Sequence, residues 1–447
     1  MEEHKGNRQG HVRASGHFKV YINSCLLSLK DSQLGFHMGP LAVPVVCVAD
    51  DAYPLADSPS GLQAVLDIMS HYAGKYQLRF NASKTKIVVT GSKADMAFYK
   101  DTTPWKLNGE TVSVVDNNDH LGLIVSGIDE EQKNVDQNII KCRNSLFALL
   151  GPVFAYRCLL SPTLQLHLWR SCCYPSLLSG LSALPIRPAN MKSLDIFQRK
   201  ILRGMLKLSQ ASPIPALHFL LGELPVEGML HIRTLGIFHN IWNNPTSTIH
   251  SMLQYLLKMC DRNSTTWANH IQIICLKYGL PSPLSLIQTI AWPKEAWDTL
   301  VKTKIISWHE KSLRSQALNN SKMKYLNVQL HGLCGRSHPA LQYILTTQDS
   351  KKLRVHLKLL TCDYIRYDSQ ACSLCNDSND DIPDLTEHIL VTCQATSSVR
   401  QRLFPELMNT VSRVQPTSSI LLYTISPLIA CPSTYQTLCV SVCTTQI

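Results

Sequence analysis

The stretch Val45-Val46-Cys47-Val48-Ala49-Asp50-Asp51 is an apolar run that ends in two adjacent carboxylates. Its β-branched residues favour a strand, and residues 41–55 together predict a strand, a turn at the two acids and a second strand. Adjacent acids at the tip of a buried strand can hold divalent cations against phosphates, as phosphoryl transfer requires. A solvated turn is the alternative interpretation of such a pair, so the surrounding sequence has to decide.

Other segments accompany this run in a fixed order. Gly6-Asn7-Arg8-Gln9-Gly10 lies upstream, and Asn81-Ala82-Ser83-Lys84-Thr85 lies downstream. Further matches are Ala56-Asp57-Ser58-Pro59-Ser60-Gly61-Leu62-Gln63, His120-Leu121-Gly122 and Leu221-Gly222-Glu223-Leu224-Pro225. Together these segments resemble the reverse transcriptase of non-LTR retrotransposons, specifically the LINE-like, jockey-type family, over nearly the whole chain.

The resemblance implies an RNA-directed DNA polymerase whose partners are RNA and DNA, bound as a template–primer duplex. It also implies an α+β fold with a partial palm, a mostly helical thumb and connector, and a small C-terminal zinc knuckle. The site residues that it implies are Asp50 and Asp51 as catalytic ligands of Mg²⁺, Arg8, Gln9 and Gly10 around the template and nucleotide, and Lys84 at the nucleotide phosphates.

Departures from the family pattern weaken the prediction of polymerase activity. Two-metal catalysis needs a third carboxylate, which in this family precedes the Arg-Gln-Gly segment and has no counterpart in an apolar strand here. Val48 stands where the family has an aromatic residue, and Pro54 removes a hydrogen-bond donor from the second strand. We therefore expect a truncated, C-terminal part of a retrotransposon polyprotein, without fingers or endonuclease, that does not polymerise DNA alone.

The composition is that of a globular protein. The 447 residues are 45% hydrophobic and 17% charged, which suits two to three domains with a sizeable core. No apolar segment reaches the length of a membrane span, so we expect no membrane partner. The first residues hold no secretory signal. Sixteen cysteines without such a signal predict reduced thiols in an intracellular protein of the cytoplasm or nucleus.

The net charge of +11 is concentrated in one part of the chain. Residues 141–240 contain eleven Lys or Arg against three acids, which gives this segment a net charge of +8. Clustered positive charge is typical of a polyanion-binding surface, because neutralising phosphates releases counterions. A solvated basic face without a partner is the alternative.

The clearest helix in this basic segment is expected over residues 190–208. Its apolar positions, such as Leu194 and Leu202, fall on one side at about 100° per residue. The opposite side is basic, and we predict that it contacts the backbone of a nucleic-acid duplex. The residues of this predicted stripe are Lys192, Arg199, Lys200, Arg203 and Lys207.

A second chemical motif is Cys372-x2-Cys375-x12-His388-x4-Cys393. Zinc prefers soft sulfur and nitrogen ligands in a closed tetrahedral site, and this spacing supplies four of them. The same spacing occurs as a zinc knuckle near the C-terminus of LINE-like proteins. We predict that the four residues bind one Zn²⁺, although Cys362 could replace a ligand. Unrelated core thiols, or a clip with a structural role alone, are the alternatives.

These features predict six successive regions. They are a partial palm at 1–95, primer-support hairpins at 96–130, a helical basic thumb at 131–240, a helical connector at 241–355, the zinc knuckle at 356–405 and a tail at 406–447. Two other functions remain open, namely a nucleic-acid-binding protein without catalysis and an inert, decayed retrotransposon product. The sequence gives no indication of the oligomeric state.

Overall fold

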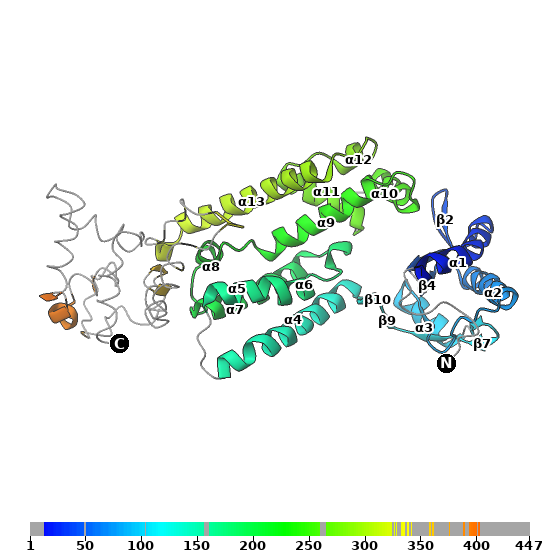
Figure 1. The fold of residues 1–447 in the computed structure, drawn as a ribbon, viewed down its shortest axis with the longest axis horizontal. Coiled ribbons are helices and arrows are strands. Elements are labelled where there is room, and N and C mark those ends of the chain that lie inside the picture. The colour runs from blue at the N-terminus through cyan, green and yellow to red at the C-terminus, as the bar shows by residue number, and fades with distance from the viewer. Residues whose placement is uncertain are drawn as a thin grey trace. The chain divides into compact units, whose positions relative to one another are not determined.

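The computed structural model describes residues 13–48, 51–102, 104–155, 161–259 and 265–323. Beyond residue 323 it describes 326, 328, 332–335, 338, 341, 357–358, 360–361, 375, 388, 393–399 and 401–402. Over these residues the protein is a mixed α+β fold in which helices predominate over small sheets (Figure 1). The expected fold class is thereby confirmed at this coarse level.

The chain divides into two compact units. Unit 1 comprises Met1–Asn134, Asn240–Asn269 and Pro283–Ala291, and unit 2 comprises Val135–His239, His270–Ser282 and Trp292–Ile447. The six predicted regions are finer than these two units, and their boundaries stay predictions. None of the helices that the structure describes combines the length and the apolar character that a membrane span requires.

Unit 1 contains most of the strands. Its elements are α1 (Ala14–Asp31), β1 (Phe36–Met38), β2 (Leu41–Val43), β3 (Val45–Val48), β4 (Asp51–Pro54), α2 (Pro59–Tyr76), β5 (Lys86–Val88), α3 (Lys93–Thr102), β6 (Lys106–Leu107), β7 (Glu110–Thr111), β8 (Ser113–Val115), β9 (Asn117–His120), β10 (Leu123–Ser126), α10 (Thr248–Met259) and α12 (Pro283–Leu286). Within the described residues these strands form five two-stranded sheets. The pairs β1–β2, β3–β4, β6–β7 and β9–β10 are antiparallel, whereas β5 and β8 are parallel.

Local sequence signals explain where these elements begin and turn. Ser58 precedes α2 and its Oγ accepts a hydrogen bond from the backbone N–H of Gly61 at 3.1 Å, while Pro59 occupies the first helical turn. Asn108 and Gly109 connect β6 to β7 with φ angles of 51° and 82°. Two successive positive φ angles are what a tight two-residue hairpin turn requires, and an Asn-Gly pair adopts them readily.

The core of unit 1 lies between α1 and α2. Ile22, Cys25 and Leu29 of α1 are buried against Val65 and Met69 of α2. The partly buried residues packed on this cluster include Val45 and Ala52, from β3 and β4. Helices α1 and α2 therefore support one face of the β3–β4 pair.

Unit 2 is helical. Its elements, including three helices that also extend into unit 1, are α4 (Glu130–Ala155), α5 (Pro162–Leu168), the π-helical turn η1 (Trp169–Cys173), α6 (Tyr174–Leu177), the 3₁₀ turn η2 (Leu181–Ala183), α7 (Pro188–Leu206), α8 (Ile214–Leu221), α9 (Val226–Trp242), α11 (Trp267–Tyr278), α13 (Lys294–Leu318), and the 3₁₀ turns η3 (Ser321–Met323) and η5 (Gln394–Thr396).

Large aromatic side chains fill the core of unit 2. Trp169, Phe219, Phe238 and Trp297 are completely buried. The Trp297 indole donates a hydrogen bond to the carbonyl of Leu235 at 3.1 Å, so its polar atom is satisfied. Along α13 the buried residues recur every four positions, which is the spacing of a single helix face. They are Trp297, Val301, Ile305, His309, Leu313 and Ala317.

Candidate functional site

The two acids predicted to be catalytic belong to a hairpin. Val48 at the end of β3 pairs with Asp51 at the start of β4, so only residues 49 and 50 connect the two strands. The strand–turn–strand arrangement predicted for this segment is thereby confirmed. Asp50 lies outside the described residues, whereas Asp51 is exposed at the tip of the hairpin.

The hairpin presents a partly open apolar face. Val46 and Val48 are 45% and 44% exposed, and the strand register places Tyr53 and Asp51 on the same face. The strand expected to be buried is therefore buried only in part, because alternate residues of β3 are exposed. In the described residues β3 and β4 form a sheet of their own, and α1 and α2 cover only the face that contains Val45. Tyr53 on the other face is half-buried, and its ring centroid lies 4.9 Å from that of His120, so Asp51 stands at the exposed end of a partly covered face.

The downstream motif forms a tight turn. The side chain of Asn81 accepts a hydrogen bond from the backbone N–H of Lys84 at 3.2 Å, and the hydroxyl of Thr85 donates to the Asn81 carbonyl at 2.8 Å. These bonds explain the asparagine and the threonine of the motif, because both hold the turn. The Lys84 side chain is exposed, and no ion pair among the described residues joins it to Asp51.

Four other predicted site residues lie outside the described residues. They are Arg8, Gln9 and Gly10 of the upstream motif and Cys372 of the metal motif.

Helix α7 contains the predicted basic stripe, and its five residues are not equivalent. Lys192, Lys200 and Lys207 are exposed. The guanidinium of Arg199 instead forms an ion pair with Asp195 at 2.6 Å, and Arg203 donates a hydrogen bond to the carbonyl of Ser212 at 3.2 Å.

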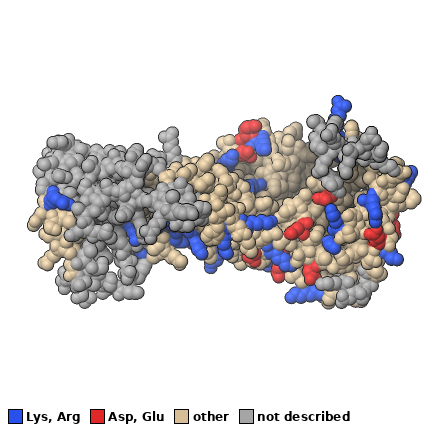
Figure 2. Space-filling model, turned by 60° about the horizontal axis from the view of Figure 1, so that its bottom comes forward, with Lys and Arg blue, Asp and Glu red and all other residues tan. Residues whose placement is uncertain are grey.

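The predicted basic stripe of five residues is therefore reduced to three. The side chain of Arg199 is only 17% exposed, and burial raises the pKa of its partner Asp195 although the guanidinium opposes this shift. Arg199 and Arg203 serve the packing of unit 2, which leaves three lysines as the exposed basic residues of the helix. On the face drawn in Figure 2, basic side chains predominate over acidic ones in the described surface.

The run Leu221-Gly222-Glu223-Leu224-Pro225 is clamped by two side chains, the exposed Arg170 and the buried Gln198. Arg170 binds the carboxylate of Glu223 at 2.6 Å and the carbonyl of Gly222 at 3.0 Å. The amide of Gln198 donates to the carbonyl of Leu224 at 2.9 Å and accepts from the backbone N–H of Val226 at 2.8 Å. The run thus has a structural role, because it joins α8 to α9 with its backbone hydrogen bonds satisfied by side chains.

Sequence reasoning missed this clamp. Gln198 stood on the apolar side of the predicted helix, and a completely buried amide on such a face needs partners. A polar amide on an apolar helix face was therefore the sequence feature that could have indicated the clamp. Burial raises the pKa of Glu223, and Arg170 counteracts the shift.

Three of the four predicted zinc ligands lie together. Cys375, His388 and Cys393 each offer a ligand atom, and these atoms all lie within 4.8 Å of one another. The Cys375 Sγ and His388 Nε2 atoms are 3.3 Å apart, and Cys393 is buried. The Cys-x2-Cys-x12-His-x4-Cys spacing therefore did predict which of the described residues meet, and a metal ion such as zinc fits their ligand chemistry.

Comparison with models of known protein families gives no match, and comparison with curated proteins gives none either. The assignment of a function therefore depends on the residues and geometry described above.

Proposed function

We propose that this chain is part of a non-LTR retrotransposon reverse transcriptase and that it binds a template–primer duplex of RNA and DNA. The observation that carries the proposal is the β3–β4 hairpin, which has two-residue spacing between its strands and Asp51 exposed at its tip. The exposed Val46 and Val48 beside that acid leave room for a nucleic-acid end to approach. Asp50 and Asp51 would hold a Mg²⁺ ion there, and an intact polymerase would add the third carboxylate that two-metal catalysis needs.

Unit 2 would hold the backbone of the duplex. Lys192, Lys200 and Lys207 extend from one helix, and ammonium groups bind phosphates as point charges without reading the base sequence. This part of the proposal does not depend on catalysis. It therefore also supports the alternative function, a nucleic-acid-binding protein that does not polymerise.

Zinc is the metal that we propose for the Cys375, His388 and Cys393 cluster, with Cys372 as the fourth ligand. In a tetrahedral site with ordinary Zn–S and Zn–N bonds, a sulfur and a nitrogen ligand lie about 3.6 Å apart. The 3.3 Å between the Cys375 and His388 ligand atoms is close to this value. The bound ion would order the segment around it and would take no part in polymerisation.

Charge reversal of the three exposed lysines tests the proposal. The variant Lys192→Glu, Lys200→Glu, Lys207→Glu should bind a fluorescent RNA–DNA duplex at least tenfold more weakly in anisotropy titrations. Each lost phosphate contact should lower the slope of log affinity against log salt by about 0.9, or about 2.7 for three contacts. Arg199 and Arg203 are left unchanged because they pair within unit 2.

The matched control reverses three exposed lysines of α13 in the same unit, Lys294, Lys302 and Lys304. It carries the same change in net charge, so a general electrostatic effect would weaken binding equally in both variants. Equal slopes for the two variants would show that the lysines of α7 form an ordinary solvated face.

A further inference from the structure

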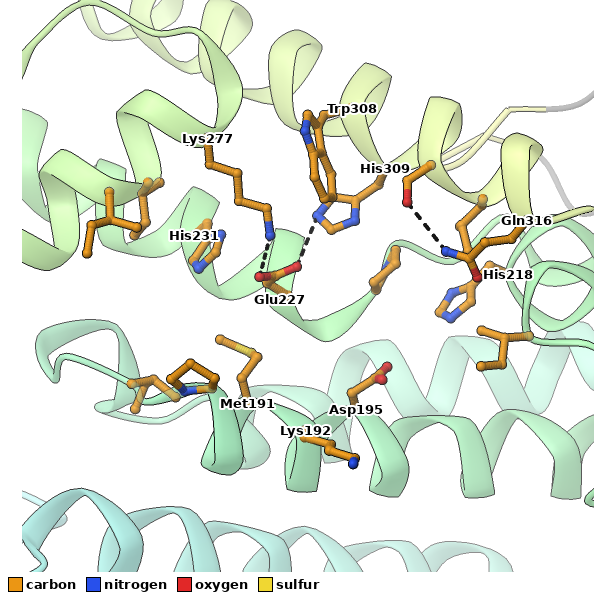
Figure 3. Close-up of a pocket in the computed structure, with 18 of the residues that line it drawn as sticks. Met191, Lys192, Asp195, His218, Glu227, His231, Lys277, Trp308, His309 and Gln316 are labelled. Atoms are coloured by element: carbon orange, nitrogen blue, oxygen red, sulfur yellow. Dashed lines mark hydrogen bonds and ion pairs between the residues drawn. The ribbon is translucent and has the colours of Figure 1, made fainter.

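Unit 2 contains a cavity that neither the motifs nor the proposed lysine contacts explain. Its volume is about 640 Å³, which lies in the range of small-molecule sites. Residues from α7, α8, α9, α11 and α13 line it (Figure 3). The wall combines aliphatic residues with polar ones, and the polar residues include His218, Glu227, Lys277 and His309.

The charges inside the cavity neutralise one another. Glu227 and Lys277 form an ion pair at 2.5 Å, and the Lys277 ammonium also lies 4.3 Å from the centre of the Trp308 ring. Asp195 is paired with Arg199 at 2.6 Å. An additional charge placed deep in this cavity would have no free counter-charge, so an uncharged chemical group is favoured there.

Two of the histidines are held by a shared partner. The hydroxyl of Tyr278 lies 2.8 Å from His231 Nδ1 and 3.1 Å from His309 Nε2. Burial lowers the pKa of His309 to about 3 and the pKa of His231 well below its ordinary value. Both rings are therefore neutral at physiological pH, and their hydrogen bonds fix them in place.

His218 differs because one of its ring nitrogens faces no described partner. Its Nδ1 lies 2.8 Å from the carbonyl oxygen of Glu223, so this nitrogen must carry the proton and donate. Burial lowers the pKa of the ring to about 4, which leaves Nε2 as an unprotonated acceptor. The side chain is 1% exposed and lines the cavity, and none of the described residues hydrogen-bonds Nε2. A ligand with an N–H donor would satisfy it.

Two further residues restrict the chemical class of the ligand. Trp308 lines the cavity with 37% of its surface exposed, which offers an aromatic surface to a planar group. Lys192, at the edge that α7 contributes, is exposed and makes no ion pair with any described residue. A planar, uncharged, nitrogen-rich ring attached to an anion would match all three features.

We infer that this cavity binds the base of a single unpaired nucleotide, with the base N–H at His218 Nε2, its ring against Trp308 and its phosphate at Lys192. The inference rests on the proposed function, since it identifies what unit 2 recognises beyond the duplex backbone. A base has the required planarity and donors. Its phosphate remains outside the neutral interior, where the unpaired lysine can reach it.

Calorimetric titration of the full chain with the four nucleoside 5′-monophosphates tests this inference, with ribose 5-phosphate as the probe for binding of phosphate alone. We expect at least one nucleotide to bind with one-to-one stoichiometry, and ribose 5-phosphate to bind at least tenfold more weakly. His218→Phe keeps a ring but removes the acceptor, and it should weaken nucleotide binding at least tenfold. Trp308→Leu, at a partly exposed position that tolerates change, should do the same.

Two matched controls accompany these variants. Trp292→Leu changes an indole that is 39% exposed in the same unit and does not line the cavity, so it should leave nucleotide binding unchanged. Lys192→Ala should weaken nucleotide binding, whereas Lys294→Ala, at an exposed lysine of α13 that does not line the cavity, should not.

The outcomes separate the two proposals. Duplex binding without binding of any mononucleotide, or wild-type nucleotide affinity in both His218→Phe and Trp308→Leu, would overturn the cavity assignment and leave the proposed function standing. Absence of both duplex and nucleotide binding would overturn both. Stronger binding of ribose 5-phosphate than of any nucleotide would show a phosphate site without base recognition.

Discussion

The hydrogen bonds inside the two units of this protein join residues at different separations along the chain. In unit 1 the recognisable motifs are stabilised by neighbours, as in the Asn81–Thr85 turn and the Ser58–Gly61 cap. In unit 2 the decisive contacts join residues far apart, such as Arg170 and Glu223, which are 53 positions apart, or Trp297 and Leu235, which are 62 apart. The Asn81–Thr85 turn and the Ser58 cap can therefore form with little tertiary support, whereas unit 2 depends on polar contacts between helices.

The largest difference between the two units should be the loss of stability of unit 2 in acid. His218 and His309 are neutral in the folded unit 2, with pKa values lowered by burial to about 4 and about 3. An unfolded chain protonates them near pH 6.5, so it binds more protons than the folded one below that pH. Stability is then lost as the pH falls from 6.5 towards 4, by about 1.4 kcal/mol per pH unit for each such histidine.

Urea unfolding at a series of pH values would measure this loss. Fluorescence of the buried tryptophans of unit 2 reports its transition, and His309→Gln should reduce the pH dependence by up to one proton. A transition of unit 2 that keeps the same midpoint from pH 7 to pH 4.5 would contradict the buried, neutral state of these rings.

Removing Arg170 should have the next largest effect. Arg170→Ala leaves the carboxylate of Glu223, only 4% exposed, without its ion-pair partner. Because the Arg170 side chain is itself 42% exposed, solvent screens the pair, and its loss should cost about 2 kcal/mol. The corresponding local contact in unit 1 is the helix cap, and its loss in Ser58→Ala should cost only about 1 kcal/mol.

Denaturant midpoints of the two variants would compare the units directly. Arg143→Ala is the matched control for Arg170→Ala, because Arg143 is exposed in unit 2 and has no described partner. Its effect should stay within about 0.5 kcal/mol. Equal costs for Arg170→Ala and Arg143→Ala would remove the distinction between clamped and solvated charges.

The metal cluster should have the smallest effect on either unit. Cys393→Ser should abolish the binding of one equivalent of Zn²⁺, because it removes a buried ligand, while the tryptophan-reported unfolding of unit 2 stays unchanged. Zinc content after dialysis, measured by atomic absorption, gives the readout. Cys362→Ser is the control and should retain the ion. The reverse pattern would mean that Cys362 is the true ligand.

The accuracy of the sequence predictions follows the same contrast between local and distant contacts. The β3–β4 hairpin was predictable because its strands and its turn are adjacent in the chain. Helix α7 was predicted over 190–208 and spans Pro188–Leu206. It ends early because Lys207 adopts a left-handed φ of 55°. Glycine is the usual residue at such a helix end, so a lysine there does not predict it.

The remaining features depend on partners that periodicity does not identify. Arg199 and Arg203 have the spacing of an exposed stripe, yet Asp195 and Ser212 engage them. His218 lies in an apolar run where a core role is the default expectation, and its free acceptor follows only from the position of the Glu223 carbonyl. Metal spacing is an exception, since the ligand chemistry itself requires Cys375 and His388 to meet.

Cleavage of a bound template–primer by Fe²⁺ placed at the Mg²⁺ site tests the central proposal most directly. With ascorbate and peroxide, iron at Asp50 and Asp51 should cut an RNA–DNA template–primer close to the primer 3′ end. The variant Asp50→Asn, Asp51→Asn should bind the duplex normally and lose this cut, whereas Asp119→Asn, an exposed acid of the same unit, should keep it. Normal duplex binding with no local cut, or with the same cut in the double variant, would contradict the assignment of the β3–β4 hairpin as the metal site of a reverse transcriptase.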